Sequence, residues 1–204
     1  MSSIRLKTKY IDKKLDTGTS KLFGTPDIFE GFVWPTILVN DEEYKLTFIG
    51  QINLKEVNKY DKEGLLPKTG MLYFFYDLDE MPFDPNDLNA CKVIYHESDI
   101  NLKPITNFDE NCLFKEIALK FKKVKNGFLS KNEETHLLLG TPSLEFELFS
   151  EFEDEWQMLF QLDSIENDEF CINFSGDGML YFYIEKEKLK NRDFSNVRII
   201  QINS

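Results

Sequence analysis

The chain has 204 residues, of which 42% are apolar and 29% are charged, a composition typical of a globular protein and unlike that of disordered or fibrous chains. Its net charge is -12, which argues against nucleic acid as a partner. No run approaches the roughly 20 apolar residues of a membrane span, and the N-terminus lacks the apolar core of a signal peptide. We therefore expect one cytoplasmic domain, residues 1–204, with no membrane partner.

The first predicted elements are two strands with a short helix between them. The aromatic content, 19 Phe, 8 Tyr and 2 Trp, favours pleated, half-buried surfaces. The apolar run at 48–52 and the aromatic run at 72–76 predict strands. Between them, Asn53 is followed three residues later by Glu56, a spacing that predicts a capping box at the start of a helix.

The next segments continue the sheet. Asp84 followed by Pro85 predicts another short helix before a strand at 91–95. The segment 104–133 fits either a strand or a helix, and we favour a strand because lysines alternate with apolar residues around 117–121. Further on, the runs 158–162 and 180–184 predict strands, and Asp163 with Glu166 repeats the spacing of the capping box.

Four blocks of the chain occur twice in the same order. GMLYFFY at 70–76 returns as GMLYFY at 178–183. The other matched blocks are 21–27 with 137–143, 46–53 with 156–163, and 88–95 with 194–201. Collinear matches of this kind predict an internal duplication, with repeats at about 20–103 and 134–204 joined by the segment 104–133. We expect an α+β fold: a duplicated, mainly antiparallel β core, a pseudo-barrel of two repeats with short helices, in which each repeat covers the apolar face of the other.

The residues needed for nucleophilic catalysis are scarce. The chain has no GxSxG elbow and only two histidines, His96 and His136. Five positions along a strand place Cys91 and His96 on opposite faces. Cys91, Cys112 and Cys171 lack CxxC spacing, so we expect free thiols. We predict no catalytic residues and no cofactor, and we lean towards a protein that is not an enzyme.

One acidic segment resembles a metal-binding loop. Asp77, Asp79, Asp84 and Asp87 could offer oxygen ligands, but Met81 stands where an EF-hand loop carries its third ligand. We interpret the segment as a solvated turn and predict no metal site.

Two glutamines, Gln51 and Gln161, stand in the middle of apolar strands. A buried amide needs hydrogen-bond partners, since leaving it unpaired costs about 1–3 kcal/mol. The partners are either neighbouring backbone groups or a ligand in a pocket between the repeats. Asp163 fits equally a helix cap or an acid in that pocket. The candidate ligand-binding residues are Trp34, Gln51, Tyr73, Trp156, Gln161, Asp163, Asp177 and Tyr181.

The same blocks resemble a known family. SKLFGTPDIFEGFVWP, LTFIGQINLKEV, GMLYFFYD, HLLLGTP and GDGMLYFYIEKEKLKNRDFSNVRII are similar to the YwqG-like family of bacterial proteins, whose function is unknown. The resemblance covers residues 20–202. The chain departs from the family pattern at Thr25, Phe29 and Phe174. What the resemblance implies is a cytoplasmic, mixed α and β protein with a duplicated, barrel-like core, and it carries over no catalytic residues.

These observations favour two functions. The first is a non-catalytic module that binds a basic protein or peptide, for example an immunity-like protein that neutralises a toxin, because acidic surfaces attract basic partners. The alternative is a small-molecule-binding protein or an enzyme that uses a pocket between the repeats. The sequence leaves the oligomeric state open.

Overall fold

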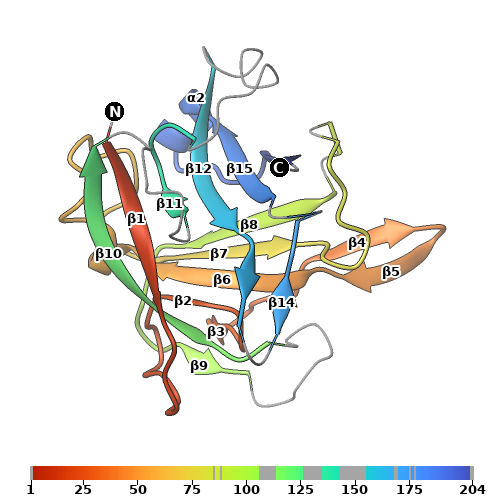
Figure 1. The fold of residues 1–204 in the computed structure, drawn as a ribbon, viewed down its shortest axis with the longest axis horizontal. Helices are drawn as coiled ribbons and strands as arrows, with labels where there is room; N and C mark the ends of the chain where they lie inside the picture. The colour runs from red at the N-terminus through yellow and green to blue at the C-terminus, as the bar shows by residue number, and fades with distance from the viewer. Residues whose placement is uncertain are drawn as a thin grey trace.

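The computed structural model describes residues 2–84, 86–87, 89–105, 114–125, 135–142, 155–167, 170–174, 176 and 178–202. These residues form a ten-stranded antiparallel sheet and three two-stranded sheets (Figure 1). The large sheet has the order β16-β15-β12-β11-β1-β10-β2-β6-β7-β8. Its strands are β1 (Ser2–Lys9), β2 (Lys21–Leu22), β6 (Thr47–Asn53), β7 (Met71–Tyr76), β8 (Cys91–His96), β10 (Ile117–Lys125), β11 (His136–Leu138), β12 (Trp156–Asp163), β15 (Met179–Glu185) and β16 (Val197–Ile202).

The small sheets pair β3 (Asp27–Ile28) with β9 (Lys103–Pro104), β4 (Thr36–Val39) with β5 (Glu42–Lys45), and β13 (Ile165–Glu166) with β14 (Cys171–Ile172). The helices in the described part of the chain are α1 (Leu54–Val57) and α2 (Lys186–Lys190). With so little helix, the fold is mostly antiparallel β, and the expected α+β class overstated the helical content.

The central pair β1 and β10 separates two sets of four strands. We call β2, β6, β7 and β8 the first set, and β11, β12, β15 and β16 the second set. The strand orders of the two sets mirror each other across β1 and β10, and the two sets cross one another in Figure 1.

The pairing of strands agrees between the sets in detail. The register of β6 on β7 shifts between Phe48 and Gly50, and that of β12 on β15 shifts between Met158 and Phe160. Just after β2 and β11, the backbone N–H of Phe23 donates to the carbonyl of Ile49 at 2.9 Å. In the second set, Leu139 donates to Leu159 at 3.0 Å. The matched sequence blocks thus occupy equivalent places in the sheet.

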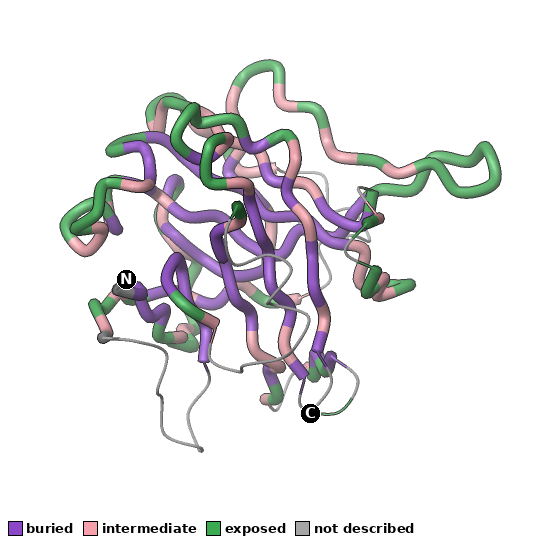
Figure 2. Tube along the Cα trace, turned by 90° about the horizontal axis from the view of Figure 1, so that it is seen from above, coloured by how far each residue is buried: buried purple, intermediate pink, exposed green. Residues whose placement is uncertain are grey.

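The main core lies between the two sets. Phe74 of β7 packs against Phe160 of β12 and Phe182 of β15, with ring centroids 4.7 and 5.5 Å apart. Figure 2 shows this buried interior surrounded by exposed loops. The two repeated aromatic strands therefore face each other across one core, which is the contact that two units covering each other's apolar faces require.

The sheet curves until its edge strands, β8 and β16, approach each other. The thiol of Cys91 donates to the carbonyl of Val197 at 3.4 Å. The hydroxyl of Tyr76 donates to Oε1 of Gln201 at 3.0 Å. Side-chain hydrogen bonds thus link the two edge regions of a nearly closed, barrel-like sheet.

Steric crowding requires a glycine before each of the two repeated aromatic strands. Gly70 has φ 100°, and a Cβ there would overlap the carbonyl oxygen of His96. A Cβ on Gly178 would overlap the carbonyl oxygens of Phe174 and Ile202. Close approach of neighbouring backbone explains why GMLYF carries a glycine in both places.

Most strand predictions are confirmed. The runs 48–52, 72–76, 91–95, 158–162 and 180–184 lie within β6, β7, β8, β12 and β15. Within the segment 104–133, residues 117–125 form strand β10, as favoured from the alternating pattern. Residues 106–113, with Cys112, and residues 126–134 lie outside the described part of the chain.

The helix predictions have mixed outcomes. Asn53 caps α1, accepting from the N–H of Lys55 at 3.0 Å. The predicted capping box is incomplete, because Glu56 bonds Ser20 and the N–H of Asn53 donates to the same serine's Oγ at 2.8 Å. No helix, however, is assigned to the described residues around Asp84, whose carboxylate accepts from the N–H of Asn86 at 2.9 Å in a turn.

The helix predicted after Asp163 is wrong, since Ile165 and Glu166 form strand β13. Across the described residues, neither helix has the length and apolar character needed to cross a bilayer.

Candidate functional site

Gln51 is fully buried in β6, and its amide is hydrogen-bonded on both sides. Its Oε1 accepts from the N–H of Asp27 at 2.8 Å. Its Nε2 donates to the carbonyl of Thr19 at 2.9 Å and to Oδ2 of Asp27 at 2.7 Å. The partners of this buried amide are therefore groups of the protein, the first of the two alternatives offered by the sequence, and not a ligand.

Gln161 occupies the matching place in β12. It is also fully buried, and its Nε2 donates to the carbonyl of Thr135 at 2.5 Å. Thr19 lies two residues before β2 and Thr135 lies one residue before β11. Each amide therefore binds the segment that leads into the neighbouring strand. These glutamines fix loops to strands.

The polar residues after the two glutamines follow the same plan. The N–H of Asn53 donates to Oγ of Ser20 at 2.8 Å, and the N–H of Asp163 donates to Nδ1 of His136 at 3.1 Å. The carboxylate of Asp163 accepts from the N–H of Thr135 at 2.8 Å. Asp163 therefore anchors the start of β11 and is not a helix cap. Asp177 lies outside the described residues.

The predicted aromatic residues lie in two separate clusters. Trp34 and Tyr73 pack beside Phe75 on the first set, where Trp34 Nε1 donates to the carbonyl of Leu46 at 2.8 Å. Trp156 and Tyr181 pack on the second set, with the guanidinium of Arg198 4.9 Å from the ring of Trp156. The structure thus divides the candidate residues into one group for each set of strands.

A buried ionic cluster, which the sequence analysis missed, lies next to Gln51. It consists of Lys21, Asp27 and Glu116. The ammonium group of Lys21 is 3.1 Å from Glu116 Oε2 and 3.5 Å from Asp27 Oδ2, and Lys21 and Asp27 are each only 2% exposed. At the place matching Lys21, the second set carries Leu137. This substitution of lysine for leucine between the matched blocks was the signal available in the sequence.

Both carboxylates of this cluster have further partners. Oδ2 of Asp27 accepts from the N–H of Gly18 at 2.9 Å, and Oε1 of Glu116 accepts from the N–H of Leu15 at 2.7 Å. Buried charges need this degree of compensation, because desolvation costs several kcal/mol per ion. The cluster therefore fastens the segment between β1 and β3 to the start of β10.

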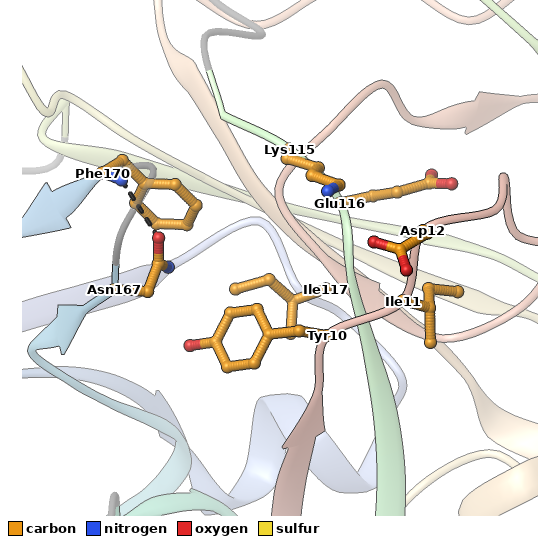
Figure 3. A pocket seen from close by; sticks show the side chains of 8 residues that line it. All are labelled: Tyr10, Ile11, Asp12, Lys115, Glu116, Ile117, Asn167 and Phe170. Atoms are coloured by element: carbon orange, nitrogen blue, oxygen red, sulfur yellow. Dashed lines mark hydrogen bonds between the residues drawn. The ribbon is translucent and has the colours of Figure 1, made fainter.

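A pocket of about 330 Å³ opens on the other side of Glu116. Figure 3 shows Tyr10 and Phe170 as aromatic walls, with Asp12 and Lys115 among the polar side chains. Because Asp12, Glu116 and Lys115 all line it, the pocket offers both signs of charge. Charge alone does not select a ligand here.

Cys91 is buried, and His96 packs against an aromatic ring. Burial raises the pKa of Cys91 to about 12, so this group stays a thiol at neutral pH. His96 stacks on Phe29 with ring centroids 4.0 Å apart.

In the acidic segment, the Asp77 carboxylate accepts from the N–H groups of Asp79 and Glu80, each at 3.2 Å. Within the described ranges, no group of three or more potential ligands is placed to hold a metal ion.

The β4–β5 hairpin projects from the body of the molecule, and we call residues 33–45 the arm. It extends to the right in Figure 1, and Figure 2 shows it mostly in the colour of exposed residues. Val33 is 79% exposed, Leu38 68% and Tyr44 49%. These are large apolar side chains gathered on one element, in contrast to the scattered single residues found on most surfaces.

The tip of the arm is a tight, acidic turn. Asn40 and Asp41 have φ 53° and 66°, the left-handed backbone of a two-residue hairpin turn. Glu42 and Glu43 follow directly, and Tyr44 donates its hydroxyl to Glu42 at 2.7 Å. The hydrogen bond to Glu42 raises the pKa of Tyr44. The sequence analysis did not single out this segment, although β-prone residues on both sides of Asn40 and Asp41 were a hairpin signal.

The fold and these sites describe a mainly antiparallel, barrel-like protein with paired buried amides and a projecting arm. The chain belongs to a family described as a domain of unknown function, DUF1963, whose model matches residues 20–146 and again residues 115–201. Among curated proteins, none matches the sequence.

Proposed function

We propose that the protein is a non-catalytic binding module whose arm docks a basic protein or peptide. The observation that carries this proposal is the combination of exposed apolar side chains and carboxylates on one projecting hairpin. The high pKa of Cys91 supports the non-catalytic part.

The arm has the form of a surface that a partner completes. A two-stranded hairpin is only marginally stable without packing on one face, and all four residues of β5 are exposed. Tyr44 pairs with Ile37 and so shares one face of the hairpin with Val39, which is 41% exposed. Covering Val39 and Tyr44 would bury apolar surface, which favours association by about 25 cal/mol per Å² of apolar area. Among the described strands, β5 pairs with β4 alone, so its other edge offers backbone groups for pairing with an extended segment.

Charge determines the kind of partner. Asp41, Glu42 and Glu43 lie together at the tip, with Lys45 as the one cation of β5, and the whole chain has a net charge of -12. Such a field accelerates association with a basic partner and repels an acidic one. A basic toxin neutralised in an immunity-like role fits this chemistry.

The experiment begins by crosslinking the protein in a lysate of its host and purifying the partner that is captured. Calorimetry with that partner then compares the wild type with Val39→Ser/Tyr44→Ser, two residues of one face, and with Glu42→Lys/Glu43→Lys. We expect each double variant to weaken binding at least tenfold, since interface anchors contribute about 2 kcal/mol or more, and rising salt to weaken wild-type binding.

Phe83→Ser is the matched control, because Phe83 is 72% exposed but lies outside the arm. An acidic partner, or a basic partner whose affinity the arm variants leave unchanged, would contradict the proposal.

Three further proposals concern the family, the origin of the fold and the location of the protein in the cell. The chain is a YwqG-like protein of bacterial type, and its two sets of strands derive from a duplicated ancestor. Two structural features support the duplication: the mirrored strand order and the shared register shifts. The family model also matches two overlapping ranges of the chain, 20–146 and 115–201. A cytoplasmic location agrees with the free thiols of Cys91 and Cys171.

A further inference from the structure

We propose that a second site, a pocket between the two sets of strands, binds a small organic anion with an apolar body. The pocket has a volume of about 380 Å³, within the range of small-molecule sites. Residues 64–67, which follow α1 of the first set, form one wall. Gln157 of β12 and the segment 186–192, with helix α2, form the other. The inference does not depend on the arm or its partner.

Positive charge gathers at this pocket in an acidic protein. Lys186, Lys190 and Arg192 line it, and Glu187 is the one acid among the described residues of the lining, whereas the chain as a whole has a net charge of -12. Lys190 and Glu187 are 3.6 Å apart but 74% and 77% exposed, so this pair is weak and solvent-screened. The surplus of cations favours an anionic ligand.

Arg192 is held in a special position. Its φ is 58°, a backbone conformation that is uncommon for a residue with a Cβ. Its N–H donates to the carbonyl of Leu189 at 3.0 Å at the end of α2. Its positive charge acts on Tyr95, where it partly offsets the rise in pKa that burial causes. The guanidinium forms no ion pair with a residue that the structure describes, so it can pair with a carboxylate or a phosphate.

The floor of the pocket is apolar, with one buried amide. Leu66 and Leu189 are 6% and 2% exposed. Gln157 is 4% exposed, and its Nε2 donates to the carbonyls of Gly140 and Met158 at 3.1 and 2.9 Å. With both N–H groups committed, the amide presents its carbonyl oxygen as an acceptor for a hydroxyl or N–H of the ligand. The lining therefore fits an anion joined to an apolar, hydroxyl-bearing body.

The matching place in the other set shows that these cations are not a by-product of the fold. There, Thr47, Leu78, Asp79 and Met81 meet Cys171 and Ile172 around a pocket of about 110 Å³. Thr47 stands where the second set has Gln157, and Leu78 and Asp79 stand where it has Lys186 and Glu187. Among the residues that the structure describes, no lysine or arginine lines this smaller pocket. The enlargement and the positive charge belong to one of two equivalent places, as expected of a specialised site.

The test uses the purified full chain and four probes: phenyl phosphate, benzoate, phenol and inorganic phosphate. We expect calorimetry to show binding of phenyl phosphate or benzoate and at least tenfold weaker binding of phenol and inorganic phosphate. The ratio between phenyl phosphate and benzoate distinguishes a phosphate from a carboxylate ligand. Lys190→Gln/Arg192→Gln should weaken the bound probe at least tenfold, since it removes two charge-assisted interactions.

Lys120→Gln/Lys122→Gln is the control, because it removes the same charge from exposed positions on β10. Thermal unfolding of each variant verifies the fold, and the single variant Lys190→Gln replaces the double variant if that one does not fold. Equal weakening by the control pair, binding of phenol as tight as that of phenyl phosphate, or no binding of either anionic aromatic probe would overturn the proposal.

Discussion

The first and second sets of strands share a backbone plan but differ in the polar groups that it holds. Both bury a glutamine in the middle of a strand, Gln51 opposite Lys21 and Gln161 opposite Leu137. Both also carry a register shift at the same place in the strand pair. Yet the first set places Lys21 where the second has Leu137, and the second surrounds its pocket with cations that the first lacks. The buried amides and the glycines are thus common to both sets, whereas the charged side chains differ between them.

The largest effect should come from the core that the two sets share. Phe74→Ala and Phe182→Ala should each lower the free energy of unfolding by about 3–5 kcal/mol, because each leaves a cavity in a fully packed interior. Urea denaturation measures the loss, with Phe83→Ala, at an exposed position, as the control. A loss below about 1 kcal/mol for one of the two phenylalanines would show that the sets do not depend equally on this core.

The ionic cluster should produce the next largest difference between the sets. Lys21→Met leaves two carboxylates without their cation, and we expect it to lower the free energy of unfolding by about 3 kcal/mol. Leu137→Met, at the matched place, should cost less than about 1.5 kcal/mol. The triple variant Lys21→Met/Asp27→Asn/Glu116→Gln should recover part of the loss in the same urea titration. Equal losses for Lys21→Met and Leu137→Met would mean that the cluster contributes nothing.

The two buried glutamines allow a finer comparison. Gln51 bonds the carboxylate of Asp27, whereas Gln161 donates to the backbone carbonyl of Thr135. Because bonds to charged groups contribute more, Gln51→Leu should cost about 3 kcal/mol and Gln161→Leu about 1 kcal/mol. Chemical denaturation of both variants gives the two values, and the reverse order would refute this account of the amides.

The smallest effect should be a dependence on pH confined to the first set. Burial raises the pKa of Glu56, although hydrogen bonds with Ser20 lower it in part. A carboxyl with a raised pKa in the folded state favours folding while it is protonated, and this contribution is lost as the pH rises through the folded pKa. Glu56→Gln should therefore be slightly more stable than the wild type at about pH 7, with the gain vanishing near pH 4.

Glu166→Gln provides the comparison, because Glu166 is exposed at the matched place in the second set. Its stability should follow that of the wild type across the same range of pH. A larger gain for Glu166→Gln than for Glu56→Gln would contradict the assignment of the effect to burial.

The strands and their correspondence could be predicted from the sequence, because alternation and repeated blocks are local properties. The polar details could not be predicted, since they depend on contacts between distant segments. Asp163 has the spacing of a helix cap, but the N–H of Thr135 supplies its partner. In the sequence, Lys21 is indistinguishable from an ordinary surface lysine. Only the fold places it beside Glu116, which is distant in the chain. The four aromatic candidate residues divide between two clusters, Trp34 and Tyr73 on the first set and Trp156 and Tyr181 on the second, because each cluster packs on its own set of strands.

The N-terminal strand β1 lies in the middle of the sheet, pairing on one side with β10 and on the other with β11. During translation, its backbone therefore has neither neighbour until β10 (Ile117–Lys125) has left the ribosome. Nascent chains that stall before that point expose a strand with two open edges, which makes them prone to aggregation and dependent on chaperones. Fusions or truncations at the first residues should accordingly affect yield more than similar changes at loop tips.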